Sequence, residues 1–105
     1  MHIEISTDGN ISGSDGLTSH TKEIVQEALI HLSGQITRVE VHLSDANAGN
    51  TGQHDKHCMI EARLEGRQPT AVTHTAATLD QAVKGAADKL KRSLQSTLGR
   101  LQDDH

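Results

Sequence analysis

The sequence contains no phenylalanine, tyrosine or tryptophan among its 105 residues. Proteins that read single-stranded RNA through RRM or OB folds stack the bases on aromatic rings, and each stack contributes about 1–3 kcal/mol. The composition excludes this mode of recognition, so any RNA would have to be recognised through its backbone and shape. The core must likewise be built from Ile, Leu, Val and Ala, supplemented by Met.

Cysteine and long apolar runs are also scarce. The single cysteine, Cys58, excludes an internal disulfide and is compatible with a reducing cytosol. No apolar run approaches 18 residues, and no charged segment followed by an apolar one marks an export signal. We therefore expect a cytoplasmic protein with no membrane partner, organised as one domain over residues 1–105.

Positive charge is in deficit overall but concentrated near the end of the chain. The formal net charge of −4 argues against a generic nucleic-acid binder, and we expect no binding to DNA. Residues 84–101, however, carry five basic and one acidic side chain, whereas residues 1–83 carry five basic and eleven acidic ones. A basic segment thus follows an acidic one.

Alternating apolar and polar residues predict four strands. The first two cover Met1 to Thr7 and Ile36 to Ser44, and a polar stretch from Asp45 to Asp55 is the longest candidate for a flexible loop. A third strand points Cys58, Ile60, Ala62 and Leu64 to one side. The short turn from Glu65 to Pro69 then leads to a fourth strand through Thr75, which predicts an antiparallel hairpin.

Two segments have the periodicity of amphipathic helices. Leu17 to Leu32 places its apolar residues along one stripe, and Ser33-Gly34 is a plausible end. Thr78 and Gln81 fit a capping box before a long helix whose stripe runs from Leu79 to Leu101. The whole predicts an α+β fold of order β-α-β-β-β-α, a four-stranded sheet with two helices on one face.

The residues give little support to enzymatic or metal chemistry. The run His54-Asp55-Lys56-His57-Cys58 contains zinc ligands by type, but neighbours on a strand point to opposite faces, so we expect no metal and a buried Cys58. Glu61 and Glu65 alternate with Arg63, which favours a solvated, charge-paired surface. The eight histidines are scattered, and the glycine loops match neither Walker A nor GxGxxG. We expect no enzyme and no cofactor.

The basic second helix allows two interpretations. Lys84 and Lys91 lie one heptad apart, and Lys89 and Arg92 flank them. They are either an ordinary solvated face with i,i+4 pairs from Lys84 to Asp80 and from Arg92 to Asp88, or a ridge that contacts phosphates.

Residues 78–94 resemble the second helix of the hibernation-promoting factor and ribosome-associated inhibitor A family, also called sigma-54 modulation proteins. In that family an acidic residue is followed by Lys-Leu-x-Arg and a further leucine. The positions that match are Asp88, Lys89, Leu90, Arg92 and Leu94. The predicted order of strands and helices also resembles this family over essentially the whole chain. Asp80 departs from it, standing where an aromatic residue is usual.

The resemblance implies a fold related to double-stranded RNA-binding domains. It also implies binding in the mRNA and tRNA channel of the small ribosomal subunit under stress, where the protein inhibits translation by occupancy, as a short form of the family. Lys89 and Arg92 match the family's basic helix positions, Lys84 and Lys91 extend the same ridge, and further candidates for rRNA contact are Lys22, Lys56 and Arg63. The acidic net charge motivates an alternative, in which the family scaffold serves as a protein-binding regulatory module.

Overall fold

The computed structural model describes residues 1–8, 11, 15–45 and 56–103. Residues 46–55, most of the loop expected between the second and third strands, lie outside the described part. The elements, in chain order, are β1 (His2–Thr7), α1 (Asp15–Leu29), the 3-10 turn η1 (Ile30–Leu32), β2 (Ile36–Asp45), β3 (Lys56–Leu64), β4 (Thr70–Ala76) and α2 (Leu79–Asp103). The predicted α+β fold and its element order are confirmed.

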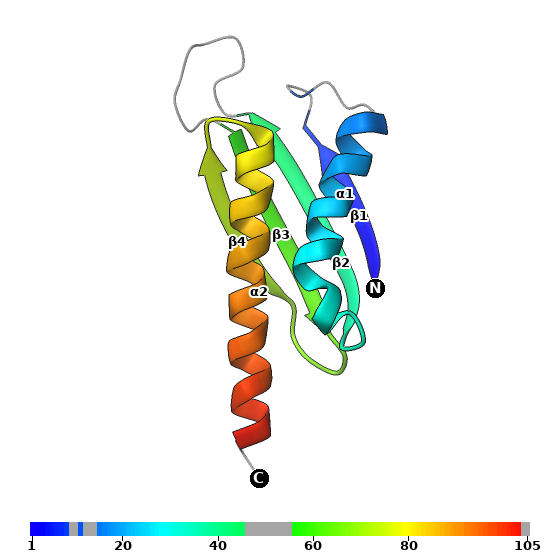
Figure 1. Cartoon of the computed structure of the whole chain (residues 1–105), viewed down its shortest axis with the longest axis vertical. Coiled ribbons are helices and arrows are strands. Elements are labelled where there is room, and N and C mark those ends of the chain that lie inside the picture. Colours follow the sequence, from blue (N-terminus) through cyan, green and yellow to red (C-terminus); the bar gives the residue numbers. More distant parts are fainter. Residues whose placement is uncertain (9–10, 12–14, 46–55, 104–105) are drawn as a thin grey trace.

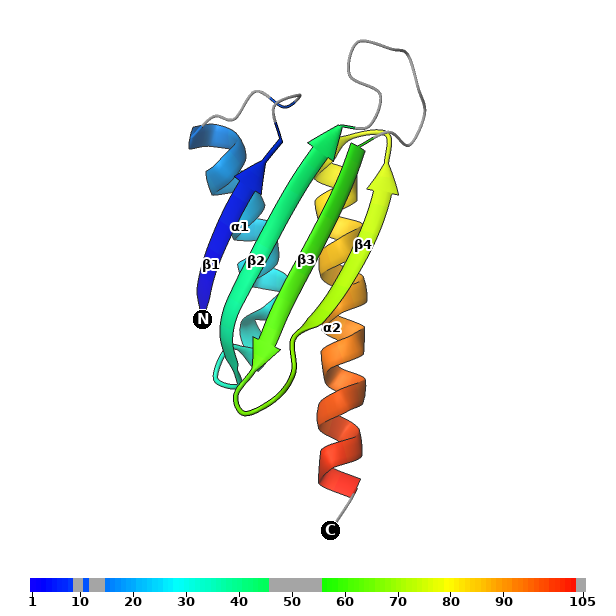
Figure 2. The same cartoon turned by 180° about the vertical axis from the view of Figure 1, so that it is seen from behind.

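The strands form one mixed sheet in the order β1-β2-β3-β4. β1 runs parallel to β2, and β2, β3 and β4 are successively antiparallel, as expected for the β3–β4 hairpin. Both helices lie on the same face of this sheet (Figure 1). The opposite face is open in the reverse view, with α1 behind β1 and β2 and α2 behind β3 and β4 (Figure 2). This asymmetry decides where the core and the charged surfaces lie.

The core lies between the helices and the covered face of the sheet. The residues predicted to point inward from β3 are buried, and Val39, Val41 and Leu43 of β2 join them. The helices contribute Val25 and Leu29 from α1 and, from α2, Ala82, Val83, Ala86, Ala87, Leu90 and Leu94. Since apolar burial contributes about 25 cal/mol per Å², this aliphatic layer drives folding without any aromatic ring.

The helix ends differ slightly from the expected ones. α1 begins at Asp15, two residues before the predicted start, which places a carboxylate in its first turn, where the helix dipole favours negative charge. The last turn of the predicted helix is the 3-10 segment Ile30–Leu32. At α2 the predicted cap is present, since the Gln81 backbone N–H donates to Thr78 Oγ1 at 3.1 Å.

α2 is the longest element, with 25 residues. At 1.5 Å per residue it spans roughly 37 Å. Its C-terminal part continues past the end of the sheet where β3 turns into β4 (Figure 1). The helix therefore presents part of its length beside the β3–β4 turn.

Candidate nucleic-acid interface

The predicted cations of α2 lie on two sides of the helix. Lys84 and Lys91 line a hollow of about 320 Å³ between the two helices, together with Ile24, Glu27, Ala28, Ala87 and Asp88. Lys89 lies on the opposite flank, where its Nζ donates to the backbone oxygen of Thr73 in the edge strand β4 at 3.0 Å. Because successive residues advance about 100° around a helix, Lys89 and Lys91 are separated by about 200°. The predicted ridge is therefore divided.

Two of these cations already have carboxylate partners on α2, as the i,i+4 spacing predicted. Lys84 Nζ lies 3.1 Å from Asp80 Oδ2, and Arg92 Nε lies 3.2 Å from Asp88 Oδ2. All four side chains are more than two-fifths exposed. Such surface pairs contribute about 0–1 kcal/mol, so both cations could exchange their carboxylate for a phosphate at small cost.

Asp80 also joins the two helices. Its Oδ1 lies 2.7 Å from Nε2 of His20 on α1, while its other oxygen pairs with Lys84. The hydrogen bond from His20, followed by that from Lys84, holds the pKa of the Asp80 carboxyl below its ordinary value of 3.8. The position where the resemblance expects an aromatic residue is thus occupied by a charged link between helices.

The remaining candidates are spread over the molecule. Lys22 is exposed on α1 and forms no ion pair with the described residues. Lys56, at the start of β3, pairs with Asp45 at the end of β2, with 2.9 Å between Nζ and Oδ2. That side chain is 27% exposed, so Lys56 is the candidate least available to a ligand.

Arg63 points away from the core, on the open face near the end of β3. The ion pairs expected from its alternation with Glu61 and Glu65 are absent from the described residues, and this expectation was wrong. Glu65 lies in the turn beyond the strand rather than on its face, so strand alternation does not place it beside Arg63. Arg63 instead lines a groove with Arg67, which the sequence pattern places only in the turn from Glu65 to Pro69.

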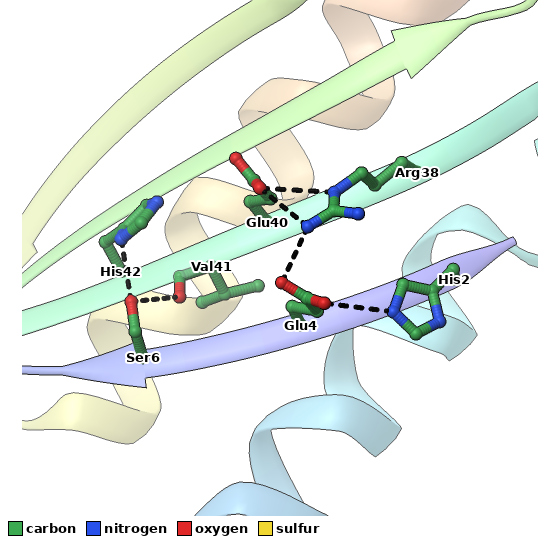
Figure 3. A network of polar contacts seen from close by, with 7 residues as sticks. All are labelled: His2, Glu4, Ser6, Arg38, Glu40, Val41 and His42. Atoms are coloured by element: carbon green, nitrogen blue, oxygen red, sulfur yellow. Dashed lines mark hydrogen bonds and ion pairs between the residues drawn. The ribbon is translucent and has the colours of Figure 1, made fainter.

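On the open face of the sheet, Arg38 is paired with two carboxylates, unlike Arg63. Arg38 Nη2 contacts Glu4 Oε2 at 2.7 Å and Glu40 Oε1 at 3.0 Å, while His2 lies 3.3 Å from Glu4 (Figure 3). Ser6 Oγ lies 2.7 Å from His42 Nδ1 in the same network. The register places Glu4, Glu40 and Glu61 side by side on β1, β2 and β3. This acidic row does not favour phosphate.

The two candidate zinc ligands that the structure describes, His57 and Cys58, do not converge. Cys58 is fully buried on the helix-covered face, and His57 occupies the opposite side of β3. Burial removes water from the thiol and raises its pKa to about 12, so it is neither a thiolate ligand nor a nucleophile near neutral pH. The described residues contain no cluster of three metal-ligating side chains, and His54 and Asp55 lie outside the described part.

A membrane-spanning helix is likewise not found among the described residues. The geometry of the described side chains thus leaves basic groups on both flanks of α2, on α1 and at the β3–β4 turn, opposite an acidic sheet face.

Comparison with solved structures gives the same fold. The chain is similar to the N-terminal domain of Protein Y from Thermus thermophilus, with 20% identity, a TM-score of 0.73 and coverage of 92% of this chain and 99% of that one. It is also similar to a ribosomal subunit interface protein from Coxiella burnetii, with 16% identity, a TM-score of 0.72 and coverage of 94% and 99%. At these identities the likeness establishes the fold alone.

Among curated proteins, nothing matches the chain. A family model described as "Sigma 54 modulation protein / S30EA ribosomal protein" matches residues 3–102. This description names a modulator and a ribosomal protein, in agreement with the expectation of a non-catalytic protein. The match spans nearly all of the chain and includes every helix and strand except the first residue of β1 and the last residue of α2. The chain therefore belongs to the sigma 54 modulation protein / S30EA ribosomal protein family.

Proposed function

We propose that this chain, acting as one domain over residues 1–105, is a ribosome-associated translation inhibitor of the hibernation type. It binds the small ribosomal subunit in the mRNA and tRNA channel under stress and acts by occupancy. Membership of the family supports a ribosomal role, and a structural relative bears the name of a ribosomal subunit interface protein. A cytoplasmic location without membrane or DNA partners belongs to the same proposal.

The observation that carries the proposal is the exposed basic surface of α2. Lys84, Lys89 and Arg92 are all exposed although the chain is acidic overall. Their present partners are surface carboxylates or, for Lys89, one backbone oxygen. Lys91 is half-buried and forms no ion pair with the described residues. These groups can turn to phosphates without opening the core, and Lys22, Lys56 and Arg63 are the candidates for additional contacts.

Phosphate contact gives the proposal a measurable signature. Each neutralised phosphate releases counterions and contributes about 0.7–0.9 to the slope of log affinity against log salt. We expect the purified protein, labelled at its N-terminus, to pellet with small ribosomal subunits at about 50 mM salt and to be released at about 300 mM. An N-terminal label is required because the thiol of Cys58 is buried.

The double variant Lys89→Gln with Arg92→Gln should remain folded and bind much more weakly, with a smaller salt slope. The matched control is Ala71→Glu with Thr75→Glu, which changes the net charge equally at two exposed positions on the open face of β4. Circular dichroism checks the fold of each protein. Equal binding by both double variants would contradict a specific role for the α2 cations.

The acidic open face favours one alternative, a protein-binding regulatory module. Glu4, Glu40 and Glu61 form a cross-strand row that suits a basic protein better than RNA. On this reading the wild type does not pellet with small subunits even at low salt. Binding to a protein partner would then be weakened by Glu40→Gln and Glu61→Gln, and unaffected by Lys89→Gln with Arg92→Gln.

A further inference from the structure

A second basic site lies at the β3–β4 turn. An open groove of about 650 Å³ is lined there by Arg63, Leu64, Gly66, Arg67, Gln68, Thr70 and Thr97. The residues come from the end of β3, the turn, the start of β4 and the C-terminal part of α2. No acidic side chain of the described part of the chain is among them.

The fold builds this groove from local turn geometry and from the length of α2. Gly66 adopts a φ of 74°, a conformation that glycine tolerates better than other residues, and the Arg67 N–H closes the turn on the Leu64 carbonyl at 3.0 Å. The last β3–β4 pair is Ala62 with Thr70, so the chain between them leaves the sheet. The part of α2 that extends past the sheet supplies Thr97 to the groove.

Arg63 and Arg67 differ from Arg38 and Arg92, the other arginines whose side chains the structure describes. Arg38 pairs with Glu4 and Glu40, and Arg92 pairs with Asp88. By contrast, the side chains of Arg63 and Arg67 are exposed and form no ion pair with any described residue. Both guanidinium groups are therefore available to an external anion.

Two carboxylates lie nearby, but in adjacent hollows. Glu61 shares one with Arg38, Glu40 and Arg63 on the open sheet face. Glu65 shares another with Arg67, Gly34, Gln35 and Leu98 on the side of the α1–β2 connection. Neither lines the groove itself, so its described wall is positively charged and otherwise neutral.

We propose that this groove holds the phosphodiester backbone of a single-stranded polyribonucleotide. A guanidinium group presents paired N–H donors that match two phosphate oxygens, and the amide of Gln68 and the hydroxyl of Thr70 add neutral donors. No aromatic ring lines the groove, so recognition rests on the phosphodiester backbone and we expect little dependence on base sequence. The identity of the strand as rRNA rests on the proposed function. The binding of a phosphodiester backbone in the groove does not depend on it.

The groove lengthens the basic surface beyond the residues expected from the family resemblance. It lies at the end of the sheet opposite the first turn of α2 (Figures 1 and 2). The α2 cations, at positions 84–92, and the groove beside Thr97 therefore offer phosphate contacts at successive positions along the same helix. A bound strand would gain contacts along the long axis of the molecule rather than across it.

The decisive experiment is an amide NMR titration of the full chain with oligouridylate. We expect saturable shifts at Gly66, Arg67, Thr70 and Thr97. These shifts should be lost in Arg63→Gln with Arg67→Gln and retained in the control Ser19→Glu with Gln26→Glu, which lowers the net charge equally at two exposed positions of α1. Absence of the shifts in the wild type, or their persistence in the groove variant, would overturn the site. Inorganic phosphate that reproduces them at an equal concentration of phosphate groups would overturn the assignment to a polynucleotide backbone.

Co-sedimentation separates this proposal from the ribosomal one. If the wild type pellets with small subunits, loss of two groove contacts should lower the salt slope by about 1.4–1.8 relative to the wild type. A slope unchanged from the wild type would overturn a role for the groove on the ribosome. If the wild type fails to pellet while the oligouridylate shifts are present, the ribosomal function is wrong and the groove stands.

Discussion

The two faces of the sheet use neighbouring residues of the same strands in opposite ways. On β3, Ile60 is fully buried beneath the helices, whereas the adjacent Met59 lies half-buried on the open face. The covered face is aliphatic, and the open face carries an ionic network around Arg38 (Figure 3). Stability and surface charge are therefore set by separate residues, so a charge can be changed for a functional test without opening the core.

The largest expected effect compares Ile60 with Met59. Ile60→Ala leaves a cavity under the helices and should lower the free energy of unfolding by about 2–5 kcal/mol. Met59→Ala removes a side chain that is still in contact with water and should cost less than about 1 kcal/mol. Urea titrations followed by circular dichroism measure both values, since the chain has no tryptophan. Similar losses for the two variants would contradict the division between the faces.

The burial of Cys58 on the covered face should make the free energy of unfolding depend on pH. Burial raises the folded-state pKa of its thiol from 9.0 to about 12, so the thiolate favours the unfolded chain. The stability contribution is fully present below about pH 9 and is lost as pH rises toward 12, by at most about 4 kcal/mol, since one pH unit corresponds to 1.36 kcal/mol. Urea titrations at pH 8, 9, 10 and 11 should show this decline.

The control for this alkaline decline is Cys58→Ala. Its free energy of unfolding should be lower at pH 8 because of the lost packing, yet it should fall less between pH 9 and 11. Other groups that titrate in this range, such as lysines, are common to both proteins. Parallel curves for the wild type and the variant would show that the thiol is accessible to water in the folded state.

A smaller effect on stability is expected for substitution of Gly85, at the edge of the core. A Cβ at this position would collide with the His74 ring, which lies against α2 from β4. Overpacking costs about 1–3 kcal/mol, whereas alanine in place of glycine gains up to about 1 kcal/mol of helix propensity. Gly85→Ala should therefore destabilise the wild type, by up to about 2 kcal/mol. In a His74→Ala background the same change should stabilise, and a double-mutant cycle in urea would detect the reversal.

These cases show how far the sequence alone could lead. The period-two pattern identified the inward residues of β3, because alternation assigns a face whatever lies beyond the strand. It could not reveal the contact of His74 with Gly85, since that contact depends on where α2 crosses β4. Helical spacing alone already separates Lys89 from Lys91 by about 200°, but it could not show that Lys89 reaches the backbone of the edge strand β4.

The groove at the β3–β4 turn was foreseen only in part. Arg63 was identified as a candidate, but Arg67 was interpreted only as part of the turn. The wall of the groove includes Thr97, which is 30 residues further along the chain than Arg67 and reaches the turn only because α2 extends past the sheet. The only signal in the sequence was a basic residue, Arg67, directly after the turn glycine. That Arg67 lines a groove could be recognised only once the structure showed α2 passing beside the turn.

The smallest expected effect is on the open face, at Arg38. Arg38→Gln removes contacts to Glu4 and Glu40, whose side chains are 53% and 36% exposed, and leaves these two carboxylates opposite each other on β1 and β2. Exposed pairs contribute about 0–1 kcal/mol and like charges directly opposite repel, so we expect a loss below about 1 kcal/mol at low salt. Screening should reduce the loss at about 0.5 M salt. Adding Glu4→Gln should recover part of it, since the repulsion then disappears. A loss at Arg38 as large as that of Ile60→Ala, and insensitive to salt, would mean that the open face contributes to stability as the core does.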